Sequence, residues 1–201
     1  MGLFLCPAFF SYFRGMNEQH NPWQINGEKT IYDNPWISVT EFDVINPSGG
    51  KGIYGKVHFK GYAIGVLPLD EELNTWLVGQ YRFPLNQYSW EIPEGGGPFH
   101  FDPLDSAKRE LLEETGLVAG QWTKIMEMHL SNSVSDEHSL IYVARDLRQE
   151  TACPEETEQL QVRKLPFEEA YQMVEEGRIT DSVSVAAILK VKLMLADGRI
   201  S

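Results

Sequence analysis

Three glutamates at helical spacing carry the strongest chemical signal in this sequence. Glu110, Glu113 and Glu114 stand at positions i, i+3 and i+4, so on a helix their carboxylates lie close together. Clustered carboxylates repel one another unless a cation lies between them, and oxygen ligands suit a hard cation such as Mg²⁺ or Mn²⁺. The same pattern also fits a solvated acidic face on an amphipathic helix. A triple glycine before the cluster, Gly95–Gly97, and Gly116 directly after it favour the metal site.

A helix over residues 103–115 must position these glutamates. Asp102 is the expected N-cap, Pro103 the first helical residue, and Asp105 completes a start that resembles a capping box. Gly116 is the expected left-handed stop. The inward face is expected to consist of the residues that fall at helical spacing on one side, namely Leu104, Ala107, Leu111 and Thr115.

With Arg109 directly before the first glutamate, this stretch resembles the Nudix box. The pattern of that box is Gly, five residues, Glu, seven residues, Arg-Glu, an aliphatic residue, any residue, Glu-Glu, any residue, Gly, aliphatic. Phe101 stands where the pattern has its isolated glutamate. This departure predicts weaker metal binding, or a site with two metal ions rather than three. The positions that fit the pattern are Gly95, Arg109, Glu110, Leu111, Glu113, Glu114, Gly116 and Leu117.

Motifs outside the box resemble the ADP-ribose pyrophosphatase (ADP-sugar diphosphatase) branch of the Nudix superfamily. This resemblance implies a homodimer in which the N-terminal hairpins are exchanged, so that residues of one subunit help to hold the nucleotide of the other. Asn132 stands where the branch usually has a proline that marks ADP-ribose preference, so the identity of the sugar stays open. The motifs are Gln80-Tyr81-Arg82, Glu91-Ile92-Pro93 before Gly95-Gly96, Glu156-Thr157-Glu158, Glu168-Glu169-Ala170 and Gly177 to Asp181.

The expected metal ligands lie on the helix and on the glycine run. Glu110 and Glu114, one helical turn apart, are the principal candidates. The backbone carbonyl near Gly95 is a further candidate, because glycine lets the main chain approach closely. Glu113 is either a third ligand or the salt-bridge partner of Arg109. Arg109 is expected to orient the carboxylates rather than to contact phosphate.

The candidate general base is Glu156, in an acidic loop before the last strand. The family pattern Glu-x-Glu-x-aliphatic-x-Val carries over onto Glu156, Glu158, Leu160 and Val162. A carboxylate base activates water while metal ions neutralise the phosphate charge, and a loop can close over the substrate. Glu155 is the nearest competitor, and the alternative reading is an acidic loop that keeps the protein soluble.

Four residues are candidates for substrate contacts. Arg82 is a candidate phosphate clamp, because a guanidinium binds phosphate oxygens in bidentate fashion, or else a surface residue at a strand end. Glu91 is expected at ribose hydroxyls or at water near the metals, or else as an edge-strand carboxylate. Trp36 is expected either to stack on the base or to fill a core or an interface. Glu137 is expected at the terminal ribose or at a metal-bound water.

Composition excludes several classes of partner and compartment. A net charge of −12 argues against a general nucleic-acid or anionic-membrane surface. No run approaches the ~18 apolar residues of a membrane span. The two cysteines, Cys6 and Cys153, form neither a metal spacing nor a disulfide framework, so the expected compartment is the cytoplasm.

The alternation of strand and helix patterns predicts an α/β (α+β) protein. We expect a Nudix-type α/β/α sandwich with a mixed central sheet and a small N-terminal antiparallel sheet. Residues 1–34 are interpreted as a tail and lead-in, 35–60 as an N-terminal β-hairpin element, and 61–201 as the catalytic domain. Strands are expected within 37–44, 53–59, 63–69, 75–80, 122–129, 140–144 and 160–165, and further helices at 167–176 and at 182–196, the latter capped by Ser182.

The resemblance therefore implies a Mg²⁺-dependent pyrophosphohydrolase. It would cleave ADP-ribose or a related nucleoside diphosphate sugar to a nucleoside monophosphate and a sugar phosphate. A GDP-sugar or a dinucleotide such as NADH is the alternative substrate. A non-catalytic ADP-ribose-sensing module is a different class, although it is expected to lose the pair Glu110 and Glu114. An isomerase on the same scaffold would need a catalytic cysteine, for which Cys153 gives weak support.

Overall fold

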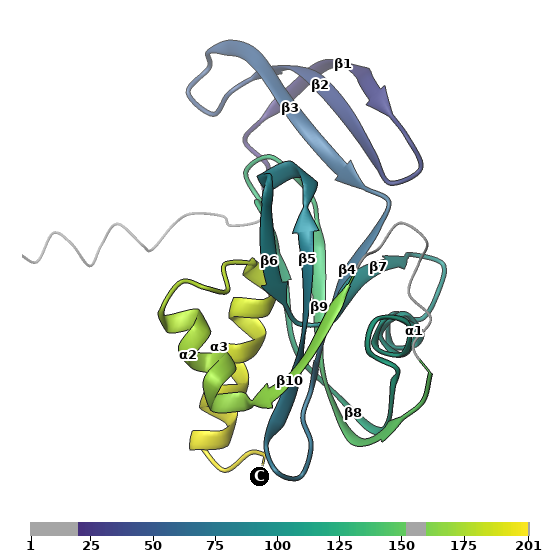
Figure 1. Cartoon of the computed structure of the whole chain (residues 1–201). Helices are drawn as coiled ribbons and strands as arrows, with labels where there is room; N and C mark the ends of the chain where they lie inside the picture. Colours follow the sequence, from purple (N-terminus) through teal and green to yellow (C-terminus); the bar gives the residue numbers. More distant parts are fainter. Residues whose placement is uncertain (1–19, 152–159, 201) are drawn as a thin grey trace, which may run out of the picture.

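The computed structural model describes residues 20–151 and 160–200, which form an N-terminal sheet and a larger body (Figure 1). The N-terminal sheet contains three antiparallel strands in the order β1-β2-β3. Their bounds are Gln24–Asp33 for β1, Ile37–Ile45 for β2 and Lys51–Phe59 for β3. The turn between β2 and β3 falls on the predicted cluster of asparagine, proline, serine and glycine after residue 45.

The body contains two sheets between helices, which confirms the predicted α/β sandwich. A four-stranded mixed sheet has the order β7-β4-β9-β8, in which β4 and β9 are parallel. A three-stranded antiparallel sheet has the order β10-β5-β6. Helix α1 lies on one side, and α2 and α3 lie on the other (Figure 1). The bounds are Gly61–Pro68 (β4), Asn74–Arg82 (β5), Gln87–Glu91 (β6), Glu94–Pro98 (β7), Pro103–Thr115 (α1), Leu117–His129 (β8), His138–Gln149 (β9), Gln161–Pro166 (β10), Phe167–Glu175 (α2) and Ser182–Ala196 (α3), with a short 3-10 turn at Phe83–Leu85.

Strands β4 and β9 are buried on both faces and therefore divide the core in two. Ile64 and Val66 of β4 pack with α1, whereas Leu67, one residue on, packs with α2 and α3. On β9, Tyr142 belongs to the α1 side and Ile141 to the α2–α3 side. Successive side chains of a strand point to opposite faces, so a continuous apolar run is what a central strand requires.

Helix α1 has the ends that the sequence predicts. The Asp102 side chain accepts a hydrogen bond from the Leu104 amide, and Pro103 occupies the first turn. Gly116 ends the helix with φ 72°, in the left-handed region where glycine carries no steric cost. The Asp105 side chain pairs with Lys108 at 2.9 Å, rather than closing the predicted capping-box-like end.

Three local predictions need correction. The lead-in predicted before residue 35 contains strand β1, whose ten residues are all exposed and so lack a hydrophobic pattern. Residues 87–98, for which no strand was expected, contain β6 and β7, and Gly95 of β7 pairs with Ile64 of β4. Helix α3 is capped by Asp181, whose side chain accepts from the Ser184 amide at 2.7 Å, and not by Ser182.

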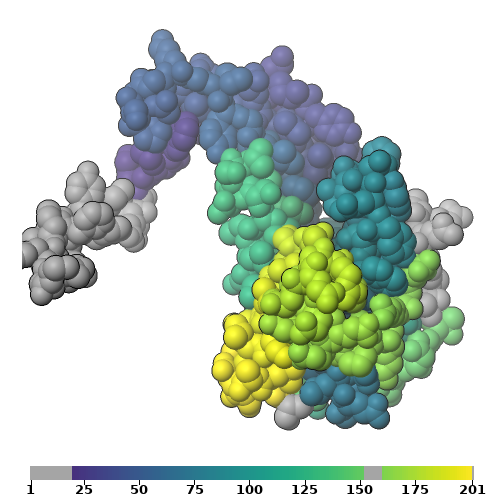
Figure 2. Space-filling model, turned by 60° about the vertical axis from the view of Figure 1, so that its left-hand side comes forward, coloured from purple at the N-terminus to yellow at the C-terminus, as the bar shows by residue number. Residues whose placement is uncertain are grey.

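The N-terminal sheet stands apart from the body. Figure 2 shows the purple and blue sheet projecting beyond the body, with green atoms of the β8–β9 region beneath it. The chain itself connects the two parts where β3 passes into β4. None of the helices in the described ranges is long and apolar enough to cross a lipid bilayer.

Candidate active site

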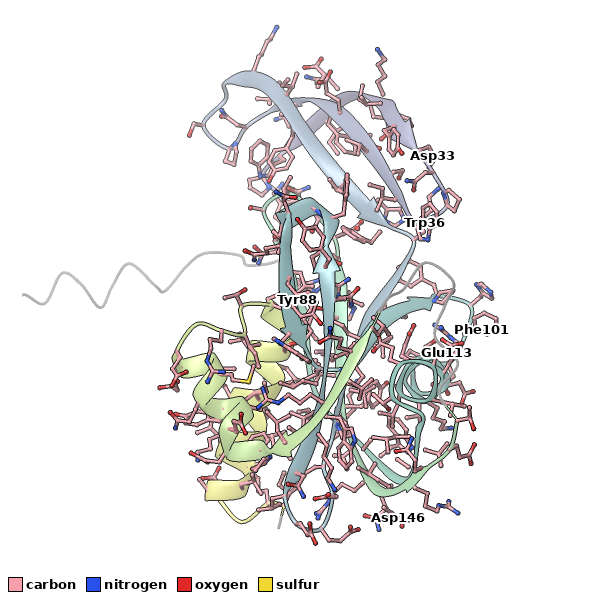
Figure 3. The ribbon with its side chains drawn as sticks, in the orientation of Figure 1. Asp33, Trp36, Tyr88, Phe101, Glu113 and Asp146 are labelled. Atoms are coloured by element: carbon pink, nitrogen blue, oxygen red, sulfur yellow. The ribbon has the colours of Figure 1, made fainter. Side chains whose placement is uncertain are left out.

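A cleft of about 880 Å³ lies between the N-terminal sheet, strand β7 and the first half of α1. Figure 3 labels Trp36 at the lower edge of the N-terminal sheet, and Phe101 and Glu113 on the side of α1. Six of the predicted site residues line this cleft, although they come from positions far apart in the chain. They are Trp36, Arg82, Gly95, Arg109, Glu110 and Glu137.

Glu110 of α1 lines the cleft, and Arg109 bonds both Glu110 and Glu113. The Arg109 Nη2 donates to Glu110 Oε1 at 2.6 Å and to the Gly96 carbonyl at 2.8 Å. Its Nη1 donates to Glu113 Oε2 at 2.6 Å. Burial alone would lower the pKa of Arg109, but Glu110 and Glu113 outweigh it and raise the pKa. Of the two readings of Glu113, the structure contains the salt bridge to Arg109.

Glu110 and Glu114 are the buried members of the cluster, with exposed fractions of 7% and 3%. Glu114 Oε2 accepts a hydrogen bond from the Glu94 amide at 3.0 Å, which ties α1 to strand β7. A Cβ on Gly95 would lie only 2.2 Å from Glu110 Oε1. Glycine at this position is therefore what allows the main chain of β7 to lie directly against the carboxylate.

The donor set fits a hard divalent cation. The two buried carboxylates and the backbone at Gly95, which carries no side chain, offer only oxygen ligands. Mg²⁺ and Mn²⁺ prefer such ligands. Within residues 20–151 and 160–200, no group of three or more His, Cys, Asp or Glu side chains has the arrangement of a complete metal site. Residues 152–159, which include the predicted base Glu156 and its competitor Glu155, lie outside the described part of the chain, as does Cys153.

Arg82 also lines the cleft, and two carboxylates hold it there. Its Nε lies 3.0 Å from each carboxylate oxygen of Glu91, and its Nη2 lies 2.8 Å from Glu94 Oε1. Burial would lower the pKa of Arg82, but the bonds to Glu91 raise it. Burial conversely raises the pKa of Glu91, but the bonds from Arg82 outweigh it, and the net pKa is lowered. Glu91 itself is 2% exposed and does not line the cleft. In this geometry it orients Arg82 and has no surface with which to contact a ribose.

Two acidic residues of the cleft escaped the sequence-based reasoning. Glu94 is the residue between Pro93 and the glycine run, and burial, reinforced by Asp181 and Glu91, raises its pKa well above the ordinary value. Asp181 is the cap of α3 and also lines the cleft. The sequence signals were the position of Glu94 between Pro93 and Gly95 and the place of Asp181 at the end of the motif Gly177 to Asp181, directly before a helix.

The remaining predicted contacts lie at the rim and on the far wall. Trp36 is 73% exposed, and its amide donates to Asn34 Oδ1 at 2.9 Å. Glu137 faces the same space, and burial followed by repulsion from Asp181 raises its pKa. Phe101, at the position of the missing box glutamate, is 58% exposed and lines the cleft mouth.

Comparison with known proteins gives matches along most of the chain. A profile of the NUDIX domain matches residues 60–186, and a profile of the nucleoside diphosphate sugar hydrolase N-terminal domain matches residues 23–57. The chain is 30% identical over 181 residues to an ADP-ribose pyrophosphatase of Mycobacterium tuberculosis, covering 86% of this chain and 84% of that relative. It is 34% identical over 168 residues to a methanol dehydrogenase activator of Bacillus methanolicus, covering 83% and 90%.

A solved structure shares the fold. The crystal structure of an ADP compounds hydrolase superimposes with a TM-score of 0.78 at 21% identity, covering 89% of this chain and 97% of that one.

Proposed function

The chain belongs to the Nudix family, and from this membership we propose that it is a pyrophosphohydrolase of ADP-ribose or a related nucleoside diphosphate sugar. The products would be a nucleoside monophosphate and a sugar phosphate. The observation that carries the proposal is the buried pair Glu110 and Glu114, held against the glycine strand, of which Glu110 lines the same cleft as Arg82. The name of the M. tuberculosis relative supports this substrate class.

We propose Mg²⁺, with Mn²⁺ as the alternative, as the metal of this cleft. Glu110, Glu114 and the carbonyl near Gly95 would hold it, and Glu113, whose Oε2 accepts from Arg109, would contribute through its other oxygen. A bound divalent cation supplies neutralisation of the charge on the diphosphate oxygens. Arg109 keeps the Glu110 carboxylate in place, and Arg82, presented by Glu91, is the proposed clamp on phosphate oxygens.

Three further residues complete the proposed site. Trp36 offers an exposed ring on which a nucleobase can stack, and Glu137 offers a carboxylate to ribose hydroxyls. Glu156 remains the proposed general base, because a carboxylate can activate the attacking water. Asn132 leaves a GDP-sugar or an NADH-type dinucleotide as the second candidate substrate.

We also propose that the protein acts as a homodimer in the cytoplasm. We assign the N-terminal sheet to an element that ends at residue 60. This sheet exposes large apolar side chains, since Ile25, Ile31 and Ile53 are 59%, 53% and 71% exposed. A second copy would cover such a surface. The net charge of −12 supports the absence of nucleic-acid and membrane partners.

The test is Mg²⁺-dependent release of nucleoside monophosphate from ADP-ribose, ADP-glucose, GDP-mannose, NADH and a diadenosine polyphosphate. Wild type is compared with Glu114→Gln, which keeps the size of the side chain and removes its charge. We expect cleavage of a nucleoside diphosphate sugar by the wild type and its loss in the variant. If nothing is cleaved while ADP-ribose raises the melting temperature, the protein is a binding module instead.

A further inference from the structure

The connection between β8 and β9 ties the N-terminal sheet to the body. The Val57 amide of β3 donates to the Val134 carbonyl at 2.9 Å, and the Asp136 amide donates to the Val57 carbonyl at 3.2 Å. The Tyr54 hydroxyl donates to the Ser133 carbonyl at 2.5 Å. This connection, residues 131–137, is called the tie loop below. It therefore pairs with the free edge of β3, whose other edge stays paired with β2 as far as Phe59.

The carboxylate of Asp136 is the centre of this junction. Its Oδ2 lies 2.8 Å from His58 Nδ1 and 3.3 Å from Lys56 Nζ. Its Oδ1 accepts the Phe59 amide at 3.0 Å. Burial would raise the pKa of Asp136, but the bonds from His58, the Phe59 amide and Lys56 outweigh it and lower the pKa. A single charged group thus collects three donors from the last four residues of one strand.

The tie loop is itself fixed to the body. The Leu130 amide donates to the Glu137 carbonyl at 3.0 Å, and the Ser135 hydroxyl donates to the Leu130 carbonyl at 2.9 Å. Both bonds close the loop on its own base, where β8 ends and β9 begins. The position of Asp136 is therefore set by the body, and β3 is held to it.

Residues on both sides of this junction between β3 and the tie loop line the cleft. Glu137, directly after Asp136, faces the cleft from the body. On the other side, Lys60 follows Phe59, and its amide donates to the Trp36 carbonyl at 2.9 Å. The path from Glu137 to Trp36 therefore runs through the Asp136 carboxylate, the end of β3 and one further backbone hydrogen bond.

We propose that Asp136 is a positioning residue that sets the distance between the Trp36 side and the Glu137 side of the cleft. The inference rests on the proposed function, in which these two residues contact the nucleotide and the sugar. Asp136 touches neither the substrate nor the metal ligands of α1. Its loss should weaken substrate binding and leave the chemistry of the bound complex unchanged.

The test uses the full-length protein and the variant Asp136→Ala. We expect the KM for ADP-ribose to rise about tenfold while kcat stays within about twofold, because the walls contact substrate and the reacting diphosphate lies at α1. Asp136→Asn keeps the acceptor for the Phe59 amide and loses the charge facing Lys56 and His58, so its KM should lie between those of wild type and alanine. The Mg²⁺ concentration for half-maximal activity should not change in either variant.

The matched control is Asp197→Ala, which removes an exposed aspartate paired with Arg199 at 2.8 Å at the end of α3. It should leave KM and kcat unchanged. Equal losses of kcat and kcat/KM in Asp136→Ala would overturn the proposal, because they would place Asp136 in the chemical step or in the general stability of the fold. An unchanged KM would overturn it as well.

Amide hydrogen exchange without ligand separates this inference from the proposed function. In Asp136→Ala the end of β3 and the tie loop should exchange faster, whereas β4 should exchange as in wild type. If the wild type cleaves none of the substrates, the proposed function fails, and faster exchange confined to the junction still supports the tie. If amide exchange at the end of β3 and in the tie loop is unchanged in Asp136→Ala, the proposed role of Asp136 is overturned, whether or not the wild type is active.

Discussion

Neighbouring glutamates of α1 differ in burial and partners, and this difference predicts unequal roles. Glu110 is 7% exposed at the floor of the cleft, whereas the side chain of Glu113 is 28% exposed and bonded to Arg109. A buried carboxylate aimed at a cation is costly to replace, whereas an exposed ion pair contributes little.

We predict that Glu110→Gln lowers kcat by about a hundredfold or more, as the loss of charge at a phosphate site does. Glu113→Gln should lower kcat by less than about tenfold, because its salt bridge is of the weak i,i+4 kind. Initial rates at saturating ADP-ribose and Mg²⁺ measure both. Equal losses in the two variants would instead make Glu113 a metal ligand.

A second residue-scale prediction concerns the glycine strand. In Gly95→Ala the new methyl group would lie 2.2 Å from Glu110 Oε1, so the carboxylate must move. We expect Mn²⁺ affinity, measured by calorimetric titration, to fall by about tenfold or more, as for other displaced ligand supports. Gly96→Ala is the matched control, since no atom lies within 4 Å of its added Cβ, and its Mn²⁺ affinity should match wild type. Equal affinities in the two variants would separate Gly95 from the metal site.

At the scale of elements, the sequence predicted those whose ends and faces depend on local chemistry. Asp102, Pro103 and Gly116 fix α1 because capping and left-handed stops need only neighbouring residues. The run Leu140–Ala144 identified β9 because both faces of that strand are covered.

The elements and residues that were missed depend on tertiary structure. Strand β1 is exposed on every residue, so it has no alternation to detect, and β7 is made largely of glycines, which are rare in strands. Glu94 and Asp181 lie 87 positions apart by number and interact only because α3 begins near β7 in the fold. Periodicity cannot reveal such a pair.

One element-scale prediction concerns the turn between β4 and β5. Asp70 is 9% exposed and accepts hydrogen bonds from the Asn74 amide at 2.7 Å and from Lys164 of β10 at 2.8 Å. Burial raises its pKa, but these bonds outweigh it and leave the pKa lowered from 3.8. The folded state therefore holds this proton less tightly than the unfolded chain does. The stabilisation is present above pH 3.8 and is lost as the pH falls through the folded-state pKa.

We expect Asp70→Asn to lose about 1–2 kcal/mol of unfolding free energy at pH 7, measured by urea denaturation. The difference from wild type should shrink at a pH below 3.8, as the pH falls through the lowered folded-state pKa of Asp70. The control is Asp105→Asn, because the Asp105 side chain is 68% exposed and pairs with Lys108. It should lower the unfolding free energy by less than about 1 kcal/mol at pH 7. A deficit of Asp70→Asn that is the same at both pH values would contradict this account.

At the scale of the whole molecule, the N-terminal sheet is the part that lacks cover. Ile53 of β3 is 71% exposed, and a three-stranded sheet with solvent-exposed faces has little hydrophobic core of its own. The proposed homodimer would bury such side chains and would bring a second chain to the cleft.

We predict that Ile53→Glu converts the dimer to a monomer, because burying an unpaired carboxylate in an apolar interface is unfavourable. Sedimentation velocity at micromolar concentration measures the change. Leu193→Glu is the control, since Leu193 is 59% exposed on α3, and its oligomeric state should match wild type. If Ile53→Glu sediments as the wild type does, Ile53 does not lie in a dimer interface.

The tie loop also has a consequence for synthesis on the ribosome. Asp136 emerges 78 residues after His58, its partner on β3. The N-terminal sheet is therefore made early, but its attachment through Asp136 must wait for these 78 residues to follow, and such distant contacts form slowly. The side of the cleft that is translated first is thus secured only after the tie loop has been made. A nascent chain stalled between His58 and Asp136 would have the N-terminal sheet but not yet the Asp136 carboxylate that ties it to the body.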